Sequence, residues 1–354
     1  MIASGQTQQW GWCDMGEWRT DPTFAMCRAL VDGAEPSSFA GGPFDVRAVM
    51  TAIRAEVKDG FLLDEVPWER FPQGNRVREA VHLLHTEGSL RAGTGVVDGM
   101  CANDTRAAAV LAVPFLIRIA ADTGHPHRAD ALAEVSCPAR ARYFGVASRE
   151  ELLLHRADTQ DGDLYDDYGV EVTGYPAGWS VAAARAAITA DTALLQPLLG
   201  DPDPSMRIDA AYTLATATDP DRSVRSAFRT RLVAEQDPIV SAALVLATAE
   251  ATRAHPHAPT TAWMRERWRD RTQAPEVRLA AAIGWLCLTD EPAPDDLRAA
   301  VDHLATDERA HAMNDLPWMA VIGGSGETGL RRCVRKMLHP GRPDPDDDPW
   351  APRH

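Results

Sequence analysis

The sequence predicts an all-α fold, because proline-led helix starts recur along it at a nearly constant spacing. Three segments align, beginning at Asp203-Pro204, Asp237-Pro238 and Ala274-Pro275, with prolines 34 and 37 residues apart. In each segment proline takes the first helical position, where its missing N–H costs nothing, and small residues follow one turn later. A helical hairpin of this period cannot bury its apolar face alone. We therefore expect the hairpins to stack into an α-solenoid.

A second helix is expected before each of these starts. Amphipathic segments run over residues 182–199, 223–234 and 260–270. Each proline-led helix thus has a partner, and each repeat has the two helices of a hairpin.

The aligned starts also predict a charged ladder between repeats. Arg207 and Arg278 occupy matching positions, and Asp203 and Asp237 lie at equivalent helix starts. Guanidinium and carboxylate groups repeated in this way favour Asp–Arg contacts that join neighbouring hairpins. We expect this ladder to be structural.

The two ends of the chain differ from the repeats. Apolar residues fall on one helix face over residues 46–57 and again over 77–84. We expect residues 1–104 to form an irregular helical N-terminal capping region and residues 105–338 to form the repeat solenoid. Residues 339–354 are rich in proline and aspartate, which predicts a flexible tail.

An acidic insertion interrupts the repeat region at about residues 143–179. The helical pattern lapses there, and residues 150–175 hold eight acidic residues against one arginine. We expect a solvated loop outside the stacked helices, able to contact a basic partner. Its carboxylates do not follow the alternate positions of a calcium-binding loop, so the interpretation as a metal site is weaker.

Two segments show a family resemblance. The run from Leu194 to Leu214, LLQPLLGDPDPSMRIDAAYTL, resembles a HEAT repeat of the short kind also found in phycobilin-lyase-like proteins. Ala109 to Ala120, AVLAVPFLIRIA, is similar to a helix of bacterial HEAT-repeat proteins. The resemblance covers about residues 105–290 and implies a right-handed α-solenoid of stacked HEAT-like hairpins with an acidic loop insertion. It implies little about chemistry, because the family includes scaffolds, lyases, hydroxylases and DNA-repair proteins.

Charge and hydropathy exclude some partners. The 354 residues carry 36 basic and 51 acidic side chains, a formal net charge of −15. Such a surface opposes the attraction to phosphates that supports nucleic-acid binding. Neither a membrane-length apolar run nor the plan of a signal peptide is found, so we expect a cytoplasmic protein without a membrane partner. About half of the negative charge lies in residues 150–175, so the repeats are less acidic than the total suggests.

Motifs for catalysis or cofactor binding are weak. The six cysteines form no CxxC pair, so we interpret them as free thiols. We interpret the two His-Pro-His segments, at 125–127 and 255–257, as turns. Residues 324–329 fit GxGxxG, but too little chain follows to complete a βαβ unit. HEAT-repeat di-iron hydroxylases carry His-Glu pairs, and the sequence has none. We expect no catalytic residue, no metal and no cofactor.

Aromatic residues are the candidate binding groups. In the resembling family the second helices line the concave face, and tyrosine and tryptophan are frequent binding anchors. Helical spacing is equally typical of aromatic residues in a core. The predicted binding residues, on the concave face and in the insertion, are Tyr212, Trp285, Trp179, Trp268, Tyr165, Asp166 and Asp167.

The leading hypothesis is a non-catalytic binding or scaffold protein. Its concave face would hold a protein or peptide, and the acidic insertion would select a basic partner. The alternative is a lyase-like enzyme or small-molecule binder with a pocket between the groove and the insertion. Recognition of DNA lesions would need a basic concave track, which the net charge opposes.

Overall fold

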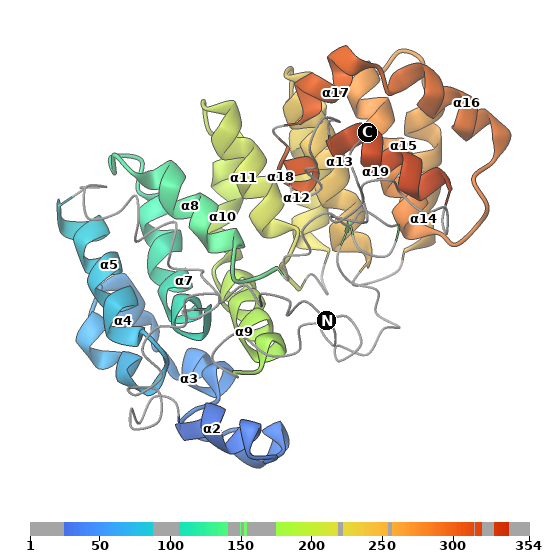
Figure 1. Ribbon diagram of the computed structural model, residues 1–354. Coiled ribbons are helices and arrows are strands. Elements are labelled where there is room, and N and C mark those ends of the chain that lie inside the picture. The colour runs from blue at the N-terminus through green and yellow to red at the C-terminus, as the bar shows by residue number, and fades with distance from the viewer. Residues whose placement is uncertain are drawn as a thin grey trace, which may run out of the picture.

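In the computed structural model every regular element of the described residues is helical, which confirms the all-α part of the predicted fold class (Figure 1). The structure describes residues 25–87, 106–140, 149, 152–153, 175–218, 222–253, 257–314, 316–320 and 329–339.

The N-terminal half contains short helices followed by longer ones. The helices are α2 (Ala25–Val31), α3 (Val46–Ala52), α4 (Ala55–Asp59), α5 (Gly74–Glu87), α7 (Arg106–Ala121), α8 (Arg128–Ser136), α9 (Ala177–Ala190), α10 (Thr192–Leu195) and α11 (Pro204–Leu214). Between them lie the 3-10 turns η2 (Pro36–Phe39), η3 (Leu63–Glu65), η4 (Trp68–Arg70) and η7 (Gln196–Gly200).

The C-terminal half contains eight further described helices. They are α12 (Ser223–Ala234), α13 (Pro238–Arg253), α14 (Ala258–Arg269), α15 (Pro275–Leu288), α16 (Asp295–Leu304), α17 (Asp307–Met313), α18 (Pro317–Ala320) and α19 (Gly329–Leu338).

The three predicted proline-led helices begin where the sequence places them. Helices α11, α13 and α15 start at Pro204, Pro238 and Pro275. The Asp203 carboxylate caps α11 by accepting the N–H of Ser205 at 2.9 Å. These are the helix-start interactions that the repeated sequence predicts.

The predicted helix over residues 182–199 is wrong in its bounds. Helix α9 begins at Ala177, and the chain breaks at Asp191 before α10 and η7. Trp179 therefore lies in the first turn of a helix, and the acidic insertion ends a few residues earlier than its sequence pattern indicates.

The hairpins pack in sequence order. Helix α12 packs against α13 and α14 against α15, while α13 contacts both α11 and α15. Helix α13 is buried on all sides from Val240 to Arg253. At Gly284 of α15, an added Cβ would lie 3.0 Å from the Cβ of Ala249, so these two helices approach closely through small residues.

The C-terminal helices pack against helices that come earlier in the chain. Helix α18 packs against α11, and α19 packs against α15 (Figure 1). Trp318 of α18 is 1% exposed and reaches Glu250 of α13. Helix α18 therefore packs against both α11 and a buried side chain of α13.

The described ends of the acidic insertion also lie inside the fold. The Arg149 guanidinium donates to the carbonyls of Met337 (2.9 Å) and Glu291 (2.8 Å). Leu153 is fully buried, and its carbonyl accepts a hydrogen bond from Arg253. These ends do not extend into solvent as a loop outside the helices would.

At the far end of the insertion, Tyr175 is anchored in the N-terminal region. Its buried hydroxyl donates to the carbonyl of Phe44 at 2.8 Å and accepts the N–H of Val46 at 3.0 Å. The described residues at the start of the insertion thus lie beside α13 and α19, and Tyr175 at its far end lies beside α3.

Candidate functional site

The predicted binding residues fall into three groups in the structure. Trp268 and Trp285 are 2% and 1% exposed and lie on α14 and α15, which pack against each other. The prediction that these two rings lie on a binding surface is wrong, because both rings are buried in the core between the two helices. Trp179 and Tyr212 are half-buried. Tyr165, Asp166 and Asp167 lie outside the described residues.

Trp179 joins the returning insertion to the N-terminal helices. The Arg47 guanidinium lies 4.0 Å from the centroid of its ring, and the Tyr175 ring meets it edge-on at 6.3 Å. Asp45 fixes Arg47 through two hydrogen bonds of 2.9 and 2.8 Å. This cation–π contact covers one face of the indole, so Trp179 helps to hold the returning chain against α3.

Tyr212 belongs to a buried polar cluster. The Arg140 guanidinium lies 3.5 Å from the Tyr212 ring centroid and donates to the Tyr212 carbonyl at 2.6 Å. The Trp318 ring meets Tyr212 edge-on, with centroids 4.8 Å apart. Tyr212 is thus held between two residues from distant parts of the chain.

Glu250 completes this cluster. Its carboxylate accepts two hydrogen bonds from Arg140, at 2.6 and 3.0 Å, and one from the Trp318 indole at 2.6 Å. The side chains of Arg140 and Glu250 are 6% and 2% exposed. A buried charge persists only when it is paired and hydrogen-bonded. We call these four residues, Arg140, Tyr212, Glu250 and Trp318, the Arg140 cluster.

Asp209 lies one turn before Tyr212 on α11. It belongs to the stripe of α11 that is least buried, with Ser205, Ile208 and Tyr212. Within the described part of the chain, its carboxylate has no hydrogen-bond or ion-pair partner. Burial, and then the negative charge of Asp203, raise the pKa of Asp209 from 3.8 to about 6. A half-buried carboxyl with such a perturbed pKa is a candidate functional group.

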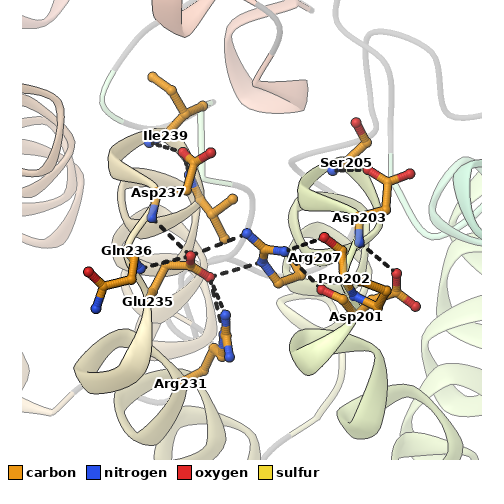
Figure 2. A network of polar contacts seen from close by, with 11 residues as sticks. Asp201, Pro202, Asp203, Ser205, Arg207, Arg231, Glu235, Gln236, Asp237 and Ile239 are labelled. Carbon is orange, nitrogen blue, oxygen red and sulfur yellow. Dashed lines mark hydrogen bonds and ion pairs between the residues drawn. The ribbon is translucent and has the colours of Figure 1, made fainter.

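Of the two arginines predicted to form the ladder, only Arg207 reaches a carboxylate among the described residues, and its partner is Glu235 and not an aspartate. Arg207 donates to the Glu235 carboxylate at 2.9 Å and to the carbonyl of Asp201 at 2.8 Å (Figure 2). Arg231 binds the same carboxylate at 2.7 Å. The Asp237 side chain instead caps its own helix, accepting the N–H of Ile239 at 2.8 Å. A carboxylate that caps a helix is not free to reach the neighbouring repeat.

The Glu235 carboxylate accepts hydrogen bonds from both Arg207 and Arg231. Burial would raise the pKa of its carboxyl, but hydrogen bonds from the Asp237 N–H and from Arg231, with the charge of Arg207, outweigh burial and lower that pKa. At the next repeat, Arg278 donates to the carbonyl of Trp268 and takes no part in a described ion pair.

The structure also bears on metal and membrane sites. Among the described residues, no group of three or more His, Cys, Asp or Glu side chains is placed to hold a metal ion. No described helix combines the length and the apolar character that crossing a membrane requires. The GxGxxG segment lies outside the described residues, apart from Gly329, which begins α19.

Comparisons with known proteins give no relative for this chain. No family model, no curated protein and no solved structure matches it. The resemblance to HEAT repeats therefore stays a prediction from the residues.

Proposed function

We propose that the chain is a non-catalytic binding or scaffold protein whose α11 surface contacts a basic protein or peptide. We define the α11 surface as Ser205, Ile208, Asp209 and Tyr212. In this proposal the hairpins form a right-handed HEAT-like α-solenoid in the cytoplasm, with neither nucleic acid nor membrane as a partner. The observation that carries the proposal is the half-buried Asp209 carboxyl.

The chemistry of Asp209 indicates the charge of the partner. Its pKa is raised to about 6, so at neutral pH the carboxylate is ionised at a cost to the folded state. A lysine or arginine of a partner would replace the lost hydration with a charge-assisted hydrogen bond. Tyr212 and Ile208 beside it offer apolar surface to the stem of such a side chain.

The proposed surface does not extend from α11 onto α13. Inner positions on α13 are covered by Trp318 and Leu153, which are both buried. A partner would therefore contact the α11 surface, including Tyr212, while Arg140, Glu250 and Trp318 stay in place.

A crosslinking experiment tests this proposal. A photo-reactive amino acid replacing Ile208 would capture the partner in a lysate of the source cells, and the purified partner would then be titrated at pH 5 and pH 8. We expect D209N to weaken binding about tenfold at pH 8 and to have little effect at pH 5, where Asp209 is protonated.

The matched control is D302N, at an exposed aspartate of α16 with the same change of charge. It should leave the affinity unchanged at both pH values. Equal affinities of wild type and D209N at pH 8 would overturn the proposal.

Asp209 also favours a second candidate, the lyase-like enzyme or small-molecule binder. A carboxyl with a pKa of about 6 can give and take a proton near neutral pH. Under this alternative a captured small molecule would be transformed by the wild type and bound unchanged by D209N. A partner that is a protein, bound without any covalent change, favours the binding function instead.

A further inference from the structure

Helices α12 and α14 bring basic side chains together. Arg229 of α12 donates to the hydroxyl of Thr260 of α14 at 3.1 Å. Its guanidinium lies 5.2 Å from the Trp263 ring centroid, and that of Arg267 lies 5.0 Å from the same centroid. The half-buried indole is therefore flanked by two positive charges from two helices.

Further cations lie near Arg229 and His257. Burial, and then the charges of Arg225 and Arg267, lower the pKa of Arg229. Burial, and then the charges of Arg222, Arg225 and Arg229, lower the pKa of His257. Positive charges thus act on both Arg229 and His257, in a chain whose net charge is negative.

Within the described residues neither Arg222 nor Arg229 forms an ion pair, and the buried Nε of Arg229 has no hydrogen-bond partner. Asp270 lies near Arg267, but its oxygens accept hydrogen bonds from Thr272 and Gln273. Asp219 and Asp221, which precede Arg222 in the sequence, lie outside the described residues.

An apolar residue extends the basic surface along α12. Val233 is 84% exposed and follows Arg229 by one helical turn. Arg229 and Val233 are four residues apart and lie on one face of α12, while Arg222 is the residue that precedes this helix. A site for a small anion would not need an exposed apolar residue one turn away.

We propose that this face, formed by Arg222, Arg229, Trp263, Arg267 and Val233, binds an acidic segment of a protein partner that carries an apolar side chain. Guanidinium groups bind carboxylates through paired hydrogen bonds, and the apolar residue of the partner would cover Val233. The negative net charge of the chain repels anions at a distance, so binding depends on these local contacts. The proposal does not depend on the function proposed for the α11 surface.

Fluorescence anisotropy of the full chain with a labelled peptide provides the test. The probe has three glutamates on each side of a central leucine, and a second probe replaces the glutamates by lysines. We expect saturable binding of the glutamate probe only, weakened at least fivefold by raising the salt from about 50 to about 300 mM. R229Q/R267Q should weaken it at least tenfold and V233S about threefold.

Two controls keep the result specific. R269Q removes a positive charge from α14 at an arginine that pairs with Asp296 at 2.7 Å, outside the proposed face, and should change the affinity by less than twofold. Circular dichroism and the thermal midpoint check that every variant folds.

Three results would overturn the proposal. They are a wild type that does not bind the glutamate probe, an R269Q variant as weak as the double variant, and a V233S variant equal to wild type while inorganic phosphate displaces the probe. The last result would mean that the face recognises an oxyanion alone. Loss of binding in R229Q/R267Q with D209N unchanged would support this face independently of the α11 surface.

Discussion

Replacing Glu250 by glutamine isolates the charge at the centre of the Arg140 cluster. The side chain keeps its shape, but one carboxylate oxygen becomes an amide nitrogen. Three donors point at this carboxylate, two from Arg140 and one from Trp318. In either orientation of the amide, at least one donor then faces another donor and loses its acceptor.

The structure sets the size of the effect. The side chains of Arg140 and Glu250 are 6% and 2% exposed, so the guanidinium left behind cannot recover hydration. Removing one partner of a buried ion pair costs about 3–5 kcal/mol. The contacts of Arg140 with the ring and the carbonyl of Tyr212 remain, so we expect E250Q to lose about 3 kcal/mol.

Urea denaturation of wild type and variant measures this loss. The matched control is E65Q, because Glu65 pairs with Arg54 at 2.8 Å while the two side chains are 46% and 67% exposed. An exposed pair contributes about 0–1 kcal/mol, so E65Q should remain close to wild type. An E250Q variant within about 1 kcal/mol of wild type, or no less stable than E65Q, would refute the reasoning.

Three further predictions concern backbone fit and titration. At Gly74 an added Cβ would lie 1.8 Å from the carbonyl oxygen of Trp68, so G74A should cost more than about 2 kcal/mol, whereas G200A, with open space, should stay within about 0.5 kcal/mol in the same denaturation assay. Because folding raises the pKa of Asp209 from 3.8 to about 6, wild type loses stability as pH rises through this range; D209N should be up to about 3 kcal/mol more stable at pH 8 and lose this advantage below pH 4. Folding lowers the pKa of Glu235, so its contribution is present above its ordinary pKa and is lost as pH falls through the folded pKa; E235Q should be destabilised at pH 7 and approach wild type in acid, as thermal unfolding across pH would show. A pH-independent difference would contradict either titration.

The helix starts are the part of the fold that sequence predicts well. Asp203, Pro204 and Pro238 act through local hydrogen bonds and backbone angles, which depend on a few neighbouring residues. The break at Asp191 between α9 and α10 was not predicted, because the apolar spacing continues across it.

The candidate site was less predictable. Tyr212 was named as a binding residue, but its contacts with Arg140 and Trp318 join segments with no common sequence pattern. Asp209 carries no motif either, and only its position on the least buried stripe of α11 distinguishes it. Placing Trp268 and Trp285 on a surface failed because periodicity identifies a helix face without saying which neighbour covers it.

The Arg140 cluster limits where an additional hairpin could be inserted into the chain. Repeat proteins commonly gain or lose hairpins, since each hairpin contacts only its neighbours. Here Arg140 and Glu250 are 110 residues apart, and Arg149 and Met337 are 188 apart. An extra hairpin between α11 and α13 would separate Glu250 from Tyr212 by about 9 Å more, beyond the reach of Arg140 and Trp318. The distance between α11 and α13 is therefore fixed by contacts with Arg140 and Trp318, which lie outside these two helices.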